Sequence, residues 1–152
     1  MSENEFYLYT KRFIEDKPAS RIALKELSKG TEIGIVLDER VECACFFEND
    51  KAHCELRAAK NPDVEFRTNN EAVRRLAEIP GDNLADMGIE ILREILGGNV
   101  SLKLLASPTR ILSGGYLGII RKAGPDFISF LAQHGLSNIW KVIGYIKAMR
   151  RG

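Results

Sequence analysis

The sequence predicts an α+β fold in which a mainly antiparallel five-stranded sheet is covered by helices, with either a filled core or an apolar cavity beneath them. Between residues 32 and 58, three consecutive segments show the alternation of apolar and polar residues that is typical of strands. Residues 63–106 then read as a strand, two helices and a returning strand. Because 152 residues suit one domain, we predict a single domain, 1–152, with a core at about 20–106 and a C-terminal helical extension at 107–152.

The N-terminal region is expected to cover one face of this sheet. Residues 3–17 form a helical pattern with an aromatic side. Pro18 interrupts the pattern, and Ser20 is expected to cap a second helix that Gly30 ends.

The segments at 32–38, 40–48 and 51–58 are predicted to be consecutive antiparallel strands. Asn49-Asp50 suits a two-residue hairpin loop. That loop sets Cys45 opposite Cys54, Phe46 opposite His53 and Glu42 opposite Arg57. A three-residue loop at 38–40 would place Ile33, Ile35 and Leu37 on the same face as the cysteines.

Three cysteines and a histidine in these strands raise the question of a metal site. The predicted register places Cys43, Cys45 and Cys54 on one face of the sheet and His53 on the other. We therefore expect buried thiols that pack as small hydrophobic side chains, with no metal ion and no cofactor. A Cys45–Cys54 disulfide is allowed by position but is not expected in a reducing compartment.

Residues 63–106 leave the sheet, pass through two helices and return to it. Thr68-Asn69-Asn70-Glu71 reads as a capping box at the start of the first helix. Asp82 is expected to cap the second helix, whose apolar stripe is wide enough to contact two surfaces. The helices need an apolar layer beneath them, which is either an ordinary core or a cavity for an apolar ligand.

The last third of the chain is glycine-rich and basic. Residues 111–124 contain four glycines and predict short helical pieces with flexible joints, followed by a helix from Gly124-Pro125-Asp126. A further helix is expected from Ser137 onward. Residues 108–152 hold seven Lys or Arg side chains and one acidic side chain, so this end is expected to face an anionic surface or the acidic half of the protein.

The sequence carries no catalytic motif of the kinds that spacing reveals. It lacks a nucleophile elbow, a phosphate-binding loop, a dinucleotide-binding glycine motif, a zinc-protease motif and a paired-cysteine motif. We therefore expect no enzyme activity, and the absence of a nucleic-acid-binding motif argues against nucleic acid as a partner. No signal peptide and no membrane-spanning apolar run is evident, so a cytoplasmic location is expected.

Three segments of the chain resemble the sterol carrier protein type 2 family. They are Pro62-Asp63-Val64-Glu65-Phe66, Glu71-Ala72-Val73-Arg74-Arg75-Leu76 and Gly98-Asn99-Val100-Ser101-Leu102-Lys103-Leu104, and the resemblance covers roughly residues 20–106. It implies a five-stranded sheet whose helices enclose an apolar tunnel for sterols, fatty acids or acyl chains.

We accordingly expect non-enzymatic binding or transfer of a lipid, fatty acid or sterol-like ligand in an internal hydrophobic cavity. The glycine-rich segment and the C-terminal helices would form a mobile lid over it. The residues expected to contact the ligand are Phe46, Phe66, Leu76, Met87, Ile91, Leu104, Leu112 and Tyr116.

The alternative is a protein-interaction module with a filled core. It would dock a partner, or an anionic membrane surface, through its basic C-terminal helix. The contacts expected from that helix are Trp140, Lys141, Lys147 and Arg150.

Overall fold

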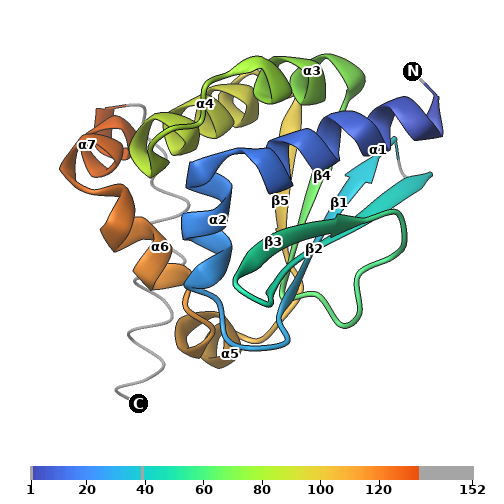
Figure 1. Ribbon diagram of the computed structural model, residues 1–152. Helices are drawn as coiled ribbons and strands as arrows, with labels where there is room; N and C mark the ends of the chain where they lie inside the picture. The colour runs from blue at the N-terminus through green and yellow to red at the C-terminus, as the bar shows by residue number, and fades with distance from the viewer. Residues whose placement is uncertain (1, 39, 134–152) are drawn as a thin grey trace.

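The computed structural model describes residues 2–38 and 40–133 and contains one five-stranded sheet (Figure 1). The strands are β1 (Glu32–Leu37), β2 (Val41–Glu48), β3 (Lys51–Glu55), β4 (Val64–Thr68) and β5 (Val100–Leu104). Their order across the sheet is β3-β2-β1-β4-β5. Only the β1–β4 pair is parallel, which confirms the predicted α+β fold with a mainly antiparallel sheet.

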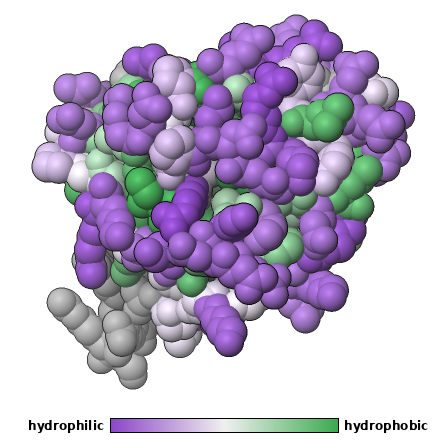
Figure 2. Space-filling model, viewed as in Figure 1, coloured by the Kyte–Doolittle hydropathy of each residue, from purple (hydrophilic) through white to green (hydrophobic). Residues whose placement is uncertain are grey.

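The described helices lie on one side of this sheet, some against its strands and others against neighbouring helices. They are α1 (Glu3–Lys11), the π-helical turn η1 (Arg12–Asp16), α2 (Pro18–Lys25), α3 (Asn70–Glu78), α4 (Leu84–Leu96), α5 (Pro108–Ser113), α6 (Tyr116–Ala123) and α7 (Pro125–Gln133). The first three contact β2 or β3, and α4 contacts β5. The molecular face seen in Figure 2 is largely hydrophilic, with apolar residues in small separate areas, because the helices turn their polar sides outward.

The predicted hairpin register is confirmed. Cys45 lies opposite Cys54 and Phe46 opposite His53, across a turn in which Asn49 and Asp50 both have positive φ. The pairing of Leu37 with Val41 confirms the three-residue loop that precedes β2. The predicted pairing of Glu42 with Arg57 is wrong, because β3 ends at Glu55.

The first part of the core lies between α1, η1, α2 and strands β1 to β3. Its fully buried side chains include Phe6, Cys43, Cys45 and Cys54. The cysteines are free and buried, as predicted. A hydrogen bond with Cys54, together with burial, raises the pKa of the Cys43 thiol, so this thiol stays protonated at neutral pH.

Two smaller apolar clusters are formed by other described residues. One joins α2, α4, α6 and α7 around Met87 and Leu84. Gly88 allows α4 and α7 to approach closely there, because a Cβ at this position would lie 2.6 Å from the Phe127 ring. The other cluster joins β4 to α5 through Val64 and Ile111.

Three predicted helix starts are displaced. Asn69, and not Thr68, caps α3 by accepting the Ala72 N–H, and Asn83, and not Asp82, caps α4. α2 begins at Pro18, and Ser20 lies inside this helix, where its hydroxyl donates to the Phe13 carbonyl at 2.6 Å. Proline is suited to a first helical position because its ring fixes φ and it has no N–H to leave unpaired.

The chain after β5 forms the short helices that its glycines predict. Ser107 caps α5, and Gly114-Gly115 joins α5 to α6. α7 begins at Pro125, as expected. The helix predicted from Ser137 lies outside the described residues.

Candidate ligand-binding surface

Strands β1, β4 and β5 align their helix-facing side chains in three rows. Directly paired residues of neighbouring strands point to the same face of a sheet, so the register defines the rows. They are Ile33–Val64–Leu104, Ile35–Phe66–Leu102 and Leu37–Thr68–Val100.

Burial differs sharply across this face. On β2, Cys43 and Cys45 are 0% and 1% exposed, so the helices cover the middle of that strand, whereas Val41 and Phe47 near its ends are partly buried. On β1 and β4, Ile33, Ile35 and Phe66 are only partly buried. On β5, Leu102 and Leu104 are 38% and 40% exposed. The helices therefore leave the row Ile35–Phe66–Leu102 partly accessible, together with Ile33 and Leu104, although Val64 between these last two is buried. We call these five accessible residues the apolar strip.

The apolar strip lies between the three parts of the core. Ile33 and Ile35 pack against the cluster under α1 and α2. Phe66 packs against the Val64–Ile111 cluster, to which Tyr116 also contributes. α4 contacts β5 at the far side of the strip.

A cluster of polar side chains lies near one end of the apolar strip. The buried Asp63 carboxylate accepts hydrogen bonds from Arg110 Nε and from the Tyr116 hydroxyl, both at 3.3 Å. Arg110 also donates to the Thr31 hydroxyl at 3.0 Å. These bonds tie α5 and α6 to the residues that precede β1 and β4. Burial, followed by the charge of Asp63, raises the pKa of Tyr116.

The side chains around the apolar strip favour contact with an apolar ligand. The Asp63 carboxylate already accepts two hydrogen bonds, and the Val64–Ile111 cluster beside it consists of aliphatic and aromatic side chains. Within residues 2–38 and 40–133, no group of His, Cys, Asp and Glu side chains is placed to hold a metal ion.

The predicted ligand contacts are distributed over different places. Phe66, Leu104 and Tyr116 lie in or beside the apolar strip. Met87 and Ile91 instead pack in the cluster formed by α2, α4, α6 and α7. Two further predicted ligand contacts are described, namely Leu76, which is partly buried on α3, and Phe46. The side chain of Leu112 lies outside the described part of the structure. The predicted partner or membrane contacts also lie outside it; they are Trp140, Lys141, Lys147 and Arg150.

Phe46 does not belong with the other predicted contacts. Its position in β2 gives it the opposite parity to Cys43 and Cys45, so it points away from the helices. There it stacks on His53, with ring centroids 5.2 Å apart, and the Arg57 guanidinium lies 5.6 Å from its ring centre. The sheet thus separates Phe46 from Phe66.

Sequence reasoning did not select Ile33, Ile35 and Leu102 as contacts. The signal was present for all three, because Leu102 has the parity of Leu104 and the two isoleucines have that of the cysteines. The Asp63–Arg110 bond carried no such signal, since 47 positions separate the two residues.

Comparisons with known proteins give little for this chain. No family model matches it, and no curated protein matches it. A solved structure described as "UbiJ-SCP2 Ubiquinone synthesis protein" aligns with 86% of this chain and 93% of its own, at 11% identity and a TM-score of 0.44. A likeness at this level carries no conclusion about function. Among the described residues, no helix is both long and apolar enough to cross a membrane.

Proposed function

We propose that this protein binds an apolar ligand, of the lipid, fatty acid or sterol class, without catalysing a reaction. The observation that carries the proposal is the accessibility of Ile33, Ile35 and Phe66 on the helix-covered face of central strands. A sheet face under helices ordinarily buries such side chains, as β2 does with Cys43.

The hydrophobic effect favours the binding of an apolar ligand to the apolar strip. Removing apolar surface from water stabilises by about 25 cal/mol per Å², and fully burying one large aliphatic or aromatic side chain contributes roughly 1.5–3 kcal/mol. The apolar strip contains five partly accessible side chains of this kind. Because each of them is already partly buried, a ligand that covered them would gain a fraction of each contribution, less the free energy of immobilising the ligand.

The proposed ligand lies with its apolar body between the sheet and α4, in an internal cavity. Phe66 and Leu104 would contact it from the sheet side, and Tyr116 from α6. The polar cluster of Asp63, Arg110 and Tyr116 then bounds one end of the site. Ligand transfer between membranes would follow if α5 and α6 open.

Organic extraction of the freshly purified protein, followed by mass spectrometry, tests the proposal directly. We expect a lipid that co-purifies in proportion to protein. We also expect saturable binding of a fluorescent fatty acid or sterol that the extracted lipid displaces. A protein that yields no lipid and binds neither probe would contradict the proposal.

A further inference from the structure

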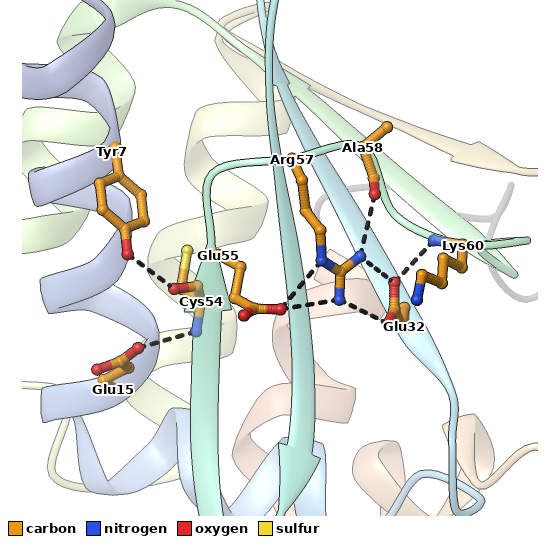
Figure 3. Close-up of polar contacts among 8 residues, drawn as sticks. All are labelled: Tyr7, Glu15, Glu32, Cys54, Glu55, Arg57, Ala58 and Lys60. Carbon is orange, nitrogen blue, oxygen red and sulfur yellow. Dashed lines mark hydrogen bonds and ion pairs between the residues drawn. The ribbon is translucent and has the colours of Figure 1, made fainter.

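The two edges of the sheet differ in how they are protected. At the β3 edge, side chains of α1 and η1 form hydrogen bonds with the backbone N–H and C=O groups of Cys54, which point away from β2 (Figure 3). The Tyr7 hydroxyl donates to the Cys54 carbonyl at 3.2 Å, and the Cys54 N–H donates to Glu15 Oε2 at 2.9 Å. Edge strands present free N–H and C=O groups on which another chain can pair, and this edge is blocked at its centre.

At the opposite edge, no strand formed by residues 2–38 and 40–133 pairs with the outer side of β5. Asn69 N–H donates to the Asn99 carbonyl, and Leu105 N–H to the Asp63 carbonyl. In an antiparallel pair only alternate residues bond to the neighbouring strand, so the bonded positions of β5 are the odd-numbered ones. The N–H and C=O groups of Val100, Leu102 and Leu104 therefore point outward, and no hydrogen bond from another described element reaches them.

The side chains of this strand do not shield its outer side. Every residue from Ser101 to Leu105 is exposed, and Leu96 at the end of α4 is also exposed. Lys103 is the only charged side chain in β5. An exposed apolar edge strand with so little charge is a template for strand addition.

We propose that β5 pairs with β5 of a second copy of this chain, in antiparallel orientation about a twofold axis at Leu102. In that register Leu102 faces Leu102 of the second copy, and Val100 faces Leu104. These are the residues whose backbone groups point outward, so each such pair exchanges both of its N–H···O bonds. The twofold axis makes the interface self-complementary, and the two sheets become one continuous sheet.

Charge selects this register over its neighbours. With the axis at Leu102, Lys103 lies opposite Ser101 of the second copy, so like charges do not meet. An axis at Lys103 would set two lysines directly opposite each other, which destabilises a strand pair. An axis at Ser101 would place Leu104 opposite Gly98, which lies outside β5.

Sedimentation velocity at low salt tests the dimer. The dissociation constant of the full chain is compared with those of two charge variants at the exposed position Ser101. Ser101→Lys sets the introduced ammonium group opposite Lys103 twice in the dimer, whereas Ser101→Glu creates two opposite-charge pairs. We expect the dimer dissociation constant to rise about fivefold in the first variant and to fall about fivefold in the second. Thermal unfolding of both variants controls for changes within the fold.

Two outcomes of this measurement would overturn the proposal. One is a chain that stays monomeric up to millimolar concentration. The other is a pair of variants whose dissociation constants shift in the same direction or remain at the wild-type value, because pairing at this register requires opposite shifts.

Cysteine cross-linking tests the register independently. Directly opposed residues that exchange hydrogen bonds have Cα atoms about 5.5 Å apart, within the range of about 4.4–6.8 Å for disulfides. Under mild oxidation, Leu102→Cys is therefore expected to form a covalent dimer. Ser101→Cys is the matched control, because its symmetry mate lies diagonally, about 7–8 Å away. The three native cysteines are buried and do not compete. Equal cross-linking rates in the two variants would exclude the Leu102 axis.

Discussion

Arg57 forms a two-pronged ion pair with Glu32, in which each terminal guanidinium nitrogen lies 2.8 Å from one carboxylate oxygen (Figure 3). The two residues belong to opposite sides of β2, and the guanidinium reaches across the Phe46 ring to make the contact. Glu32 also accepts the Lys60 N–H at 2.7 Å. The ion pair thus links the segment after β3 to β1, on the sheet face opposite the helices.

We expect Glu32→Gln to lower the free energy of unfolding by about 1–2 kcal/mol at neutral pH, because the pair is partly shielded from water and hydrogen-bonded at both prongs. Urea unfolding measures the change. Glu55→Gln is the control, since this exposed carboxylate contacts the same Arg57 at 3.0 Å, and its removal should cost less than about 1 kcal/mol. Equal losses in the two variants would contradict a special contribution from Glu32.

The same pair predicts an acid dependence. The hydrogen bond from Arg57 holds the pKa of Glu32 below its ordinary value of 4.5. The ionised form is thus favoured by folding, and its stabilisation is present above pH 4.5 and is lost as the pH falls through the lower folded-state pKa. The difference in unfolding free energy between wild type and Glu32→Gln should therefore shrink below pH 4.5. A difference that stays constant throughout the acid range would argue against this linkage.

Tyr116 predicts an alkaline dependence of the opposite sign. Burial and the Asp63 carboxylate raise the pKa of Tyr116 above its ordinary value of 10.0. The protonated phenol therefore stabilises the fold fully below pH 10, and this contribution is lost as the pH rises through the folded-state pKa. Tyr116→Phe should cost about 0.5–1.5 kcal/mol at neutral pH, and the gap to wild type should narrow above about pH 10.

Ultraviolet absorbance titration checks the assignment to Tyr116. The chain has four tyrosines, and the variant should lack the phenolate step at the highest pH. Identical titration curves for the native wild type and the native variant would show that Tyr116 ionises like an ordinary phenol.

Gly115 is expected to be intolerant of any side chain. Its φ is +96°, and a Cβ at this position would lie 2.0 Å from the Glu26 carbonyl oxygen. The joint between α5 and α6 is therefore packed against the end of α2, where the Ser28 N–H also donates to the Gly114 carbonyl. Gly115→Ala should combine backbone strain of about 1–2 kcal/mol with a displacement of this contact.

Gly98→Ala separates the two effects. Gly98 ends α4 with a φ of +80°, in the hydrogen-bond pattern of a left-handed helix terminus, and a Cβ there would meet no atom within 4 Å. Chemical denaturation should show a loss of about 1–2 kcal/mol for Gly98→Ala and a clearly larger loss for Gly115→Ala. Equal losses would mean that the approach of Gly115 to Glu26 contributes nothing.

The sequence predicted the fold where strand parity and turn chemistry act together. Asn49-Asp50 fixed the hairpin, and the hairpin fixed which side chains share a face with Cys45. The cap positions were less well determined, because Thr68 and Asn69 are adjacent residues of which both can cap a helix. The sequence supplied no local pattern for contacts such as Asp63 with Arg110, which depend on how α5 returns to the sheet.

The candidate site was only partly predictable for a related reason. Apolar character identified Met87 and Ile91 as inward-facing, but the wide stripe of α4 contacts both the sheet side and the neighbouring helices. Which surface each residue meets depends on the placement of α2, α6 and α7. Phe46 was grouped with Phe66 by residue type, although the strand register already assigned it to the other face.

The two phenylalanines provide the sharpest test of where a ligand binds. Phe66→Trp and Phe46→Trp, each made in a Trp140→Phe background, place a single indole on opposite faces of the same sheet. A bromine-labelled fatty acid quenches indole fluorescence only at short range. We expect strong quenching in the Phe66→Trp variant and little in the Phe46→Trp variant, because a ligand under the helices is separated from Phe46 by the sheet itself. Comparable quenching in both, when the two variants bind the fatty acid equally, would place the ligand outside the apolar strip.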